Sequence, residues 1–238
     1  MRKDHRPFAL KRFSAWLEAR YIEHFVRPQL EDMGRRGMIM KPWNFHVHGP
    51  GISLGDEVHV VTGRDRPVRI TTWHSDQQPQ VLVGDFALLC PGVRIDCANH
   101  ITIGANTMLA AGVYVTDADW HDLYDRAQPI GANAPVNIGN NVWLGDGTTV
   151  CKGVSIGDNT VVGAASVVTR PLPENVVAAG NPAQVVKTLD PSMPLATRAD
   201  TLASPEFAER MLGLERYVYG SNGWLNYIRT LLAPGRSD

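Results

Sequence analysis

Residues 138–168 read IGNNVWLGDGTTVCKGVSIGDNTVVGAASVV. An aliphatic residue occupies every sixth position of this stretch, namely Ile138, Leu144, Val150, Ile156, Val162 and Val168. Neither the 3.6-residue period of a helix nor the 2-residue period of an ordinary strand produces this spacing. A hexapeptide repeat does produce it, and such a repeat is typical of a parallel β-helix. The stretch therefore predicts a solenoid in which each six-residue unit is one short strand and a turn.

Three such units close one triangular coil, so each aliphatic anchor should point inward and stack on the anchor three units later. The expected stacks are Ile138 on Ile156, Leu144 on Val162, and Val150 on Val168. One coil cannot bury its own apolar face, and its stability must come from the coils beside it.

The same spacing extends toward the N-terminus of the chain. Anchors recur at Val83, Leu89 and Ile95, and then, after a slip of two residues, at Ile103, Leu109 and Val115. We therefore expect a mainly β protein with a β-helix domain over residues 51–188. Residues 1–50 are predicted as a helical cap and lead-in, and residues 189–238 as a linker and a helical tail.

The two terminal segments have helical periodicity. An apolar stripe is formed by Phe13, Trp16, Leu17, Tyr21 and Phe25, and we expect this helix to cover the open end of the solenoid. A docking site for a partner is the alternative. In the tail, residues 206–219 and the amphipathic stretch 224–232 are predicted as helices that pack on the protein's own assembly or on another protein.

Composition narrows the class of protein. The chain has 238 residues, of which 44% are hydrophobic, and a formal net charge of -1. Bulk charge therefore predicts no attraction to nucleic acid or to an anionic membrane. No apolar run reaches membrane-spanning length and no signal core follows the basic N-terminus, so we expect a cytoplasmic protein. The three cysteines are unpatterned and are expected to be reduced.

One long interruption of the repeat, residues 116–137, carries an unusual set of polar and aromatic side chains. Within the ten residues 117–126 lie four Asp, one His, one Trp, one Tyr and one Arg. Long loops within a regular solenoid are usually functional. From the residue types alone, a solvated acidic bulge held down by its aromatic side chains is an equally good interpretation.

Several segments together resemble the left-handed β-helix, hexapeptide-repeat acyltransferases, in particular the maltose, galactoside and xenobiotic O-acetyltransferases. The matching segments are 117–121 (DADWH), 138–145 (IGNNVWLG), 153–159 (GVSIGDN), 163–170 (GAASVVTR) and 179–183 (AGNPA). The resemblance covers about residues 50–190 and implies the left-handed sense of the coils.

This resemblance implies direct transfer of an acetyl group from acetyl-CoA to a hydroxyl of a saccharide-like acceptor. His121 matches the family's catalytic base, and imidazole suits that role because its ordinary pKa is near neutrality. Asp119 or Asp117 could orient the ring, and both, with Trp120, would line the acceptor pocket. No nucleophilic Ser or Cys is expected, because no acyl-enzyme is formed.

The resemblance also assigns the acetyl-CoA site to a groove between two subunits. The matching residues are Trp143, Gly145, Asp146, Ala164, Thr169, Arg170 and Lys187. Arg170 and Lys187 would contact the phosphates of CoA. Two departures from the family pattern are Gln184, where a basic residue is common, and Asp146, where a small hydroxyl residue is common.

The resemblance implies a homotrimer, and cyclic assembly would place the same groove at every interface. Two alternatives stay open: an N-acyltransferase acting on an amino sugar or an antibiotic, and a non-catalytic β-helix scaffold or binding module. No metal is expected, because a zinc site of three histidines would need more than His100 and His121 near the central coils.

Overall fold

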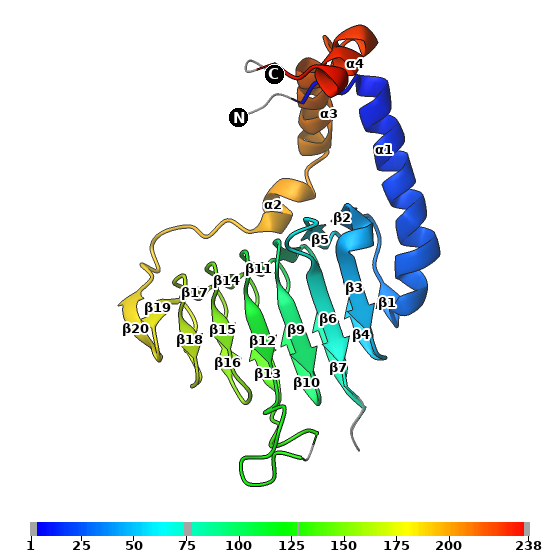
Figure 1. The fold of residues 1–238 in the computed structure, drawn as a ribbon. Coiled ribbons are helices and arrows are strands. Elements are labelled where there is room, and N and C mark those ends of the chain that lie inside the picture. The colour runs from blue at the N-terminus through cyan, green and yellow to red at the C-terminus, as the bar shows by residue number, and fades with distance from the viewer. Residues whose placement is uncertain (1–3, 74–77, 128, 236–238) are drawn as a thin grey trace. The chain divides into compact units, whose positions relative to one another are not determined.

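A computed structural model describes residues 4–73, 78–127 and 129–235. The chain forms two compact units, one of residues 21–199 and one that joins residues 1–20 to residues 200–238. The larger unit is a parallel β-helix, as predicted, with successive coils stacked along its axis (Figure 1).

Three sheets form the sides of the β-helix, here named sheets A, B and C. Sheet A contains β1 (Asp32–Met33), β4 (Ile52–Leu54), β7 (Gln80–Val83), β10 (His100–Ile103), β13 (Val136–Ile138) and β16 (Ser155–Ile156). Sheet B contains β2 (Met38–Met40), β5 (His59–Val61), β8 (Leu88–Leu89), β11 (Met108–Leu109), β14 (Trp143–Leu144), β17 (Val161–Val162), β19 (Val176–Gly180) and the antiparallel β20 (Ala183–Thr188). Sheet C contains β3 (Phe45–His48), β6 (Val68–Thr72), β9 (Arg94–Cys97), β12 (Tyr114–Thr116), β15 (Thr149–Val150) and β18 (Val167–Val168). The chain visits A, B and C in turn, which creates three edges: A–B, B–C and C–A.

The predicted stacks of aliphatic anchors are confirmed. Ile138 pairs with Ile156, Leu144 with Val162, and Val150 with Val168. None of these six side chains exposes more than 2% of its surface. They belong to one continuous apolar core that runs along the interior of the β-helix.

The β-helix begins earlier than residue 51. Met33 in β1 pairs with Leu54, and Ile39 in β2 pairs with Val60, so a complete first coil lies inside the segment predicted as a cap and lead-in. Met33 and Ile39 are themselves six residues apart, but the 3-10 turn at Pro42–Asn44 breaks the spacing immediately afterwards. Two anchors are too few to reveal a repeat.

The A–B edge uses one left-handed backbone conformation in each coil. The residues with positive φ there are Arg36, Glu57, Phe86, Asn106, Asn141, Asn159 and Asn175. Asn is enriched in this region of φ/ψ space. Asn141 Nδ2 donates to Asn159 Oδ1 at 3.0 Å, and Asn159 Nδ2 donates to Asn175 Oδ1 at 2.9 Å. The corner side chains thus link neighbouring coils.

The helices lie at the two ends of the sequence. Helix α1 (Phe8–Tyr21) continues into a π-helical turn (Ile22–Val26) and a 3-10 turn (Arg27–Gln29). Near the C-terminus, α2 (Arg198–Leu202) is followed by α3 (Pro205–Tyr219) and α4 (Trp224–Leu232), and the last two match the predicted helices. The expected cover over the open end of the solenoid stays a prediction.

Contacts between the chain's two ends hold the smaller unit together. The Asn222 side chain donates to the carbonyl oxygens of Asp4 and Arg6 at 2.8 and 2.9 Å. The hydrogen bonds of Arg6 lower the pKa of the Asp4 carboxyl to about 2. Within the larger unit, Arg198 Nε donates to the carbonyl oxygen of Phe86 at 2.7 Å, which fixes the returning segment on the β-helix.

The stacked core predicts a large loss of stability for Leu144→Ala. This change removes a side chain with 0% exposure and should lower the free energy of unfolding by about 2–5 kcal/mol. Leu123→Ala is the matched control, because Leu123 is 70% exposed and its truncation should cost no more than about 0.5 kcal/mol. Urea unfolding measures both, and equal losses would contradict the stacking argument.

The returning segment predicts a pH dependence centred on His59. Arg198 Nη2 donates to His59 Nδ1 at 3.2 Å, and burial together with the Arg198 charge lowers the His59 pKa below its ordinary value near 6.5. As the pH falls below about 6.5, the unfolded chain binds a proton that the folded protein does not, so this contribution to stability is lost. Between pH 7.5 and pH 5.5, the melting temperature of His59→Gln should fall less than that of wild type. His24→Gln, at an exposed histidine, should behave as wild type.

Candidate active site

The long loop between β12 and β13 leaves the C–A edge and projects from the β-helix (Figure 1). Its two arms pair near its base: Asp119 N donates to Ala132 O, Gly131 N donates to Asp119 O, and an antiparallel bridge joins Ala118 to Asn133. Only glycine fits at position 131, because a Cβ added there would lie 2.5 Å from the carbonyl oxygen of His121. His121 therefore directly follows the part of the loop whose two arms are held together by hydrogen bonds. Residue 128 lies outside the described part of the loop.

Asp117 supports the edge of the β-helix instead of lining an acceptor pocket. Its carboxylate is completely buried and accepts hydrogen bonds from the backbone N–H groups of Ala98 and Asn99 at 2.7 and 2.8 Å. The thiol of Cys97 donates to it at 3.2 Å, and burial followed by the Asp117 charge raises the Cys97 pKa. The carboxylate thus stabilises the corner where the repeat slips by two residues.

Asp119 joins the loop to the next coil. Lys152 Nζ lies 2.6 Å from Asp119 Oδ1 and forms an ion pair with it, and both side chains are about one third exposed. Within the described ranges, neither Asp117 nor Asp119 is hydrogen-bonded to the His121 ring. The orientation of His121 by one of these carboxylates stays a prediction.

A cavity of about 360 Å³ opens beside His121. Its walls are Trp73, Arg94, Asp96, Trp120, His121, Pro129 and Ile130. The Trp73 and Trp120 rings lie 5.9 Å apart at an angle of 59°, so two indole rings bound the space next to an exposed imidazole. The structure thus brings together two predicted residues, His121 and Trp120, with Trp73, Arg94 and Asp96, which were not predicted as site residues.

Hydrogen bonds behind the cavity fix its walls from the Trp73 side. Trp73 Nε1 donates to Thr71 Oγ1 at 3.0 Å, and the Thr71 hydroxyl donates to Asp96 Oδ1 at 2.7 Å. The second oxygen of the buried Asp96 forms an ion pair with Arg94, and this interaction with the Asp96 carboxylate raises the Arg94 pKa. The buried Asp96 carboxylate thus accepts from a hydroxyl at one oxygen and has a cation beside the other.

The Trp120 side is fixed in the same way. Trp120 Nε1 donates to the Tyr114 hydroxyl at 3.1 Å, and the Arg94 guanidinium lies 4.9 Å from the Tyr114 ring centroid. Both indole N–H groups are therefore committed to the protein, and the rings present apolar faces to a ligand. Sequence reasoning could have found three more wall residues. Trp73 follows the buried Ile70, and Arg94 and Asp96 flank the anchor Ile95. Assigning each repeat to one side of a three-sided coil would have placed these residues beside the loop.

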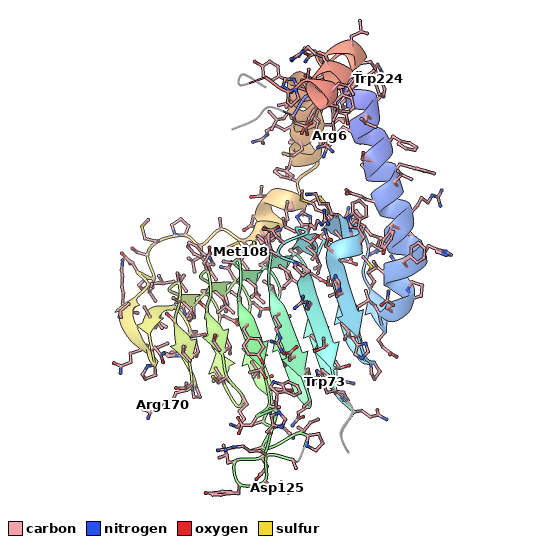
Figure 2. The ribbon with its side chains drawn as sticks, in the orientation of Figure 1. Arg6, Trp73, Met108, Asp125, Arg170 and Trp224 are labelled. Atoms are coloured by element: carbon pink, nitrogen blue, oxygen red, sulfur yellow. The ribbon has the colours of Figure 1, made fainter. Side chains whose placement is uncertain are left out.

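The predicted acetyl-CoA residues fall on different sides of one protomer. Trp143 lies in β14 of sheet B, and Gly145, Asp146 and Ala164 follow at the B–C edge. Thr169 and Arg170 lie at the C–A edge, as does His121, while Lys187 belongs to β20. Figure 2 shows Trp73, Asp125 and Arg170 toward the C–A edge, and Met108, the strand partner of Trp143, away from it. A single copy of the chain does not gather the predicted donor residues beside His121.

The part of the chain that the structure describes contains neither a cluster of metal ligands nor a membrane-spanning helix. Within it, no group of three or more His, Cys, Asp and Glu side chains is arranged to hold a metal ion. Nor does any helix in those ranges combine the length and apolar character that a bilayer crossing requires.

Comparisons with known proteins agree with this architecture. The family model described as bacterial transferase hexapeptide (six repeats) matches residues 135–170. The solved structure of AntD, an N-acyltransferase from Bacillus cereus in complex with a dTDP-amino sugar and coenzyme A, superposes with a TM-score of 0.58 at 17% identity. The superposition covers 81% of this chain and 96% of that one. At this identity, the likeness shows the fold alone.

Two curated relatives share the repeat at higher identity. The galactoside O-acetyltransferase of Escherichia coli is 40% identical over 92 residues, which are 38% of this chain and 45% of that protein. A Saccharomyces cerevisiae protein, provisionally named an acetyltransferase, is 37% identical over 118 residues, which are 49% of this chain and 60% of that protein. The chain thus spans about half the length of the curated relatives it matches. The chain thus shares the bacterial transferase hexapeptide repeat over residues 135–170 and is similar there to named acetyltransferases.

Proposed function

We propose that the protein transfers an acetyl group from acetyl-CoA to a hydroxyl of a saccharide, with His121 as the general base. The observation that carries the proposal is the cavity that the exposed His121 lines together with the indole rings of Trp73 and Trp120. Aromatic faces suit the C–H surface of a sugar ring, and imidazole suits proton transfer near neutral pH. The galactoside O-acetyltransferase among the relatives supports the same assignment.

The reaction needs little from the protein besides position and charge. A ring nitrogen of His121 takes the proton of the acceptor hydroxyl as its oxygen attacks the thioester carbonyl carbon. The carbon–sulfur bond then breaks, the acetyl ester forms, and the imidazolium returns its proton to the CoA sulfur. The transfer is complete without an acyl-enzyme, so it needs no nucleophilic side chain of the protein. Cys97, which is buried and protonated beside Asp117, therefore has no part in the reaction.

Asp119 is the carboxylate that we assign to orient His121. Asp117 already accepts two backbone hydrogen bonds in the interior, whereas the ion pair of Asp119 with Lys152 uses one of its two oxygens. An oriented imidazole keeps one nitrogen toward the acceptor. The ion pair with Lys152 would hold the carboxylate, and with it the loop, in one position.

We further propose that the active unit is a homotrimer whose sites lie between protomers. His121 lies at the C–A edge, which is the edge of a three-sided prism opposite sheet B, and Trp143 faces outward from sheet B. These two residues can therefore share a groove only if they come from different copies. Closed cyclic assembly repeats that groove once for each protomer.

The His121→Ala variant tests the base. It should bind acetyl-CoA as tightly as wild type in calorimetric titration, while acceptor-dependent thiol release falls about 10²–10⁴-fold. His24→Ala changes an exposed histidine that is distant from His121 in the sequence, and it should retain wild-type activity. An acceptor panel of neutral sugars, acidic sugars and amino sugars then distinguishes ester from amide products. Unchanged turnover in His121→Ala would exclude this histidine as the base.

A mixed trimer tests the shared site. We expect Trp143→Ala to lose activity by about 10–100-fold, because the donor would be misplaced. Trimers that contain both His121→Ala and Trp143→Ala subunits, isolated through two different tags, should hold one intact site in three. They should therefore recover about one third of wild-type activity. Activity no higher than the mean of the two single variants would contradict a site built from two protomers.

A further inference from the structure

A second cavity, of about 620 Å³, lies on the outer face of sheet C beside the cavity that holds His121. Its charged lining consists of Arg66, Arg69, Arg94, Asp65 and Asp146, and its floor includes the turns of Gly92, Gly112 and Gly147 at the B–C edge. All three glycines have positive φ, and no atom lies within 4 Å of the place where a Cβ of Gly147 would be. The backbone at this edge is therefore open to a ligand.

The arrangement of the arginines is unfavourable without a ligand. Arg69 of β6 and Arg94 of β9 are direct partners in the parallel register, so two like charges stand side by side on the same face of the sheet. Like charges at directly opposed positions destabilise a sheet. Arg94 is relieved by its ion pair with Asp96, but among the described residues neither Arg66 nor Arg69 forms an ion pair with a carboxylate.

Arg94 connects the two cavities, because it lines both. A ligand whose sugar ring lies in the cavity beside Trp73, Trp120 and His121 can therefore place a substituent across sheet C toward Arg69 and Arg66. Guanidinium groups remain charged at all physiological pH values and bind phosphate or carboxylate oxygens through two parallel hydrogen bonds. Asp65 and Asp146 also line this cavity, and their carboxylates can accept hydrogen bonds from hydroxyl groups of the same ligand.

We propose that the acceptor is a saccharide that carries an anionic group, a phosphate or a carboxylate, which Arg66 and Arg69 bind while Arg94 bridges to the sugar. This inference rests on the proposed function, since it names the substrate class of the same site. It predicts that the acceptor is selected by charge as well as by ring shape.

Binding is tested first, because it does not depend on catalysis. Glucose, glucuronate and glucose 1-phosphate are titrated calorimetrically into the full-length wild-type protein, at low and at physiological ionic strength. At least one anionic probe should bind about 10-fold or more tightly than glucose, and added salt should weaken that preference. The carboxylate and phosphate probes distinguish the two sources of charge. Equal or weaker binding of both anionic probes would overturn the inference.

The double variant Arg66→Gln/Arg69→Gln tests the residues. It should lower the affinity for the preferred anionic probe about 10–100-fold more than the affinity for glucose. Arg64→Gln is the matched control, because Arg64 is an exposed arginine of the same turn and does not line the cavity. A double variant that behaves as Arg64→Gln, or that weakens glucose equally, would overturn the inference.

Thiol release from acetyl-CoA distinguishes the failure of this inference from that of the proposed function. If wild type acetylates neutral sugars as well as anionic ones, and the double variant keeps the same ratio, the transferase assignment stands and the anionic acceptor is excluded. If wild type binds the anionic probes through Arg66 and Arg69 but neither binds acetyl-CoA nor releases thiol, the anion site stands and the transferase assignment is excluded.

Discussion

Stacking of inward aliphatic side chains from one coil onto the next is the interaction on which the rest of the structure depends. Most strands of the later coils are only two residues long, so no coil holds its shape through its own hydrogen bonds. Each anchor, such as Leu144 between Leu109 and Val162, is buried only because both neighbouring coils are present. The stack also fixes the positions of the three edges, because a change of register would turn anchors toward solvent.

The edges carry the chemistry, because insertions there leave the stack intact. The 116–137 insertion leaves and re-enters at the C–A edge, and strands β12 and β13 on either side keep their pairing with the preceding coil. A buried carboxylate would ordinarily be costly, but Asp117 receives two backbone N–H groups and a thiol at this edge. It thereby stabilises the slipped corner and the start of the loop with one side chain. The loop can then hold His121 against a wall made by earlier coils.

The outer faces of the β-helix differ in chemical character. On sheet B the outward positions Leu88, Met108, Trp143 and Val161 are in register and apolar, which suits contact with another copy of the chain. On sheet C the outward positions Arg69, Arg94 and Tyr114 are charged or polar and border both cavities. The proposed trimer would use the first face for assembly and the second for its acceptor.

The sequence by itself determined the six-residue repeat, the inward anchors, the two C-terminal helices and the place of the long insertion that carries His121. These features are local or strictly periodic, so residue spacing reveals them. Only the tertiary structure showed that Asp117 is internal, that Trp73, Arg94 and Asp96 stand beside His121, and that a first coil begins at Asp32. Trp73 and Trp120 meet because the coils in which they lie stack at one edge, and irregular insertions between coils hide that alignment from any fixed period. The predicted donor residues likewise share a motif in sequence, yet they lie on different sides of the prism, because six residues turn the chain from one face to the next.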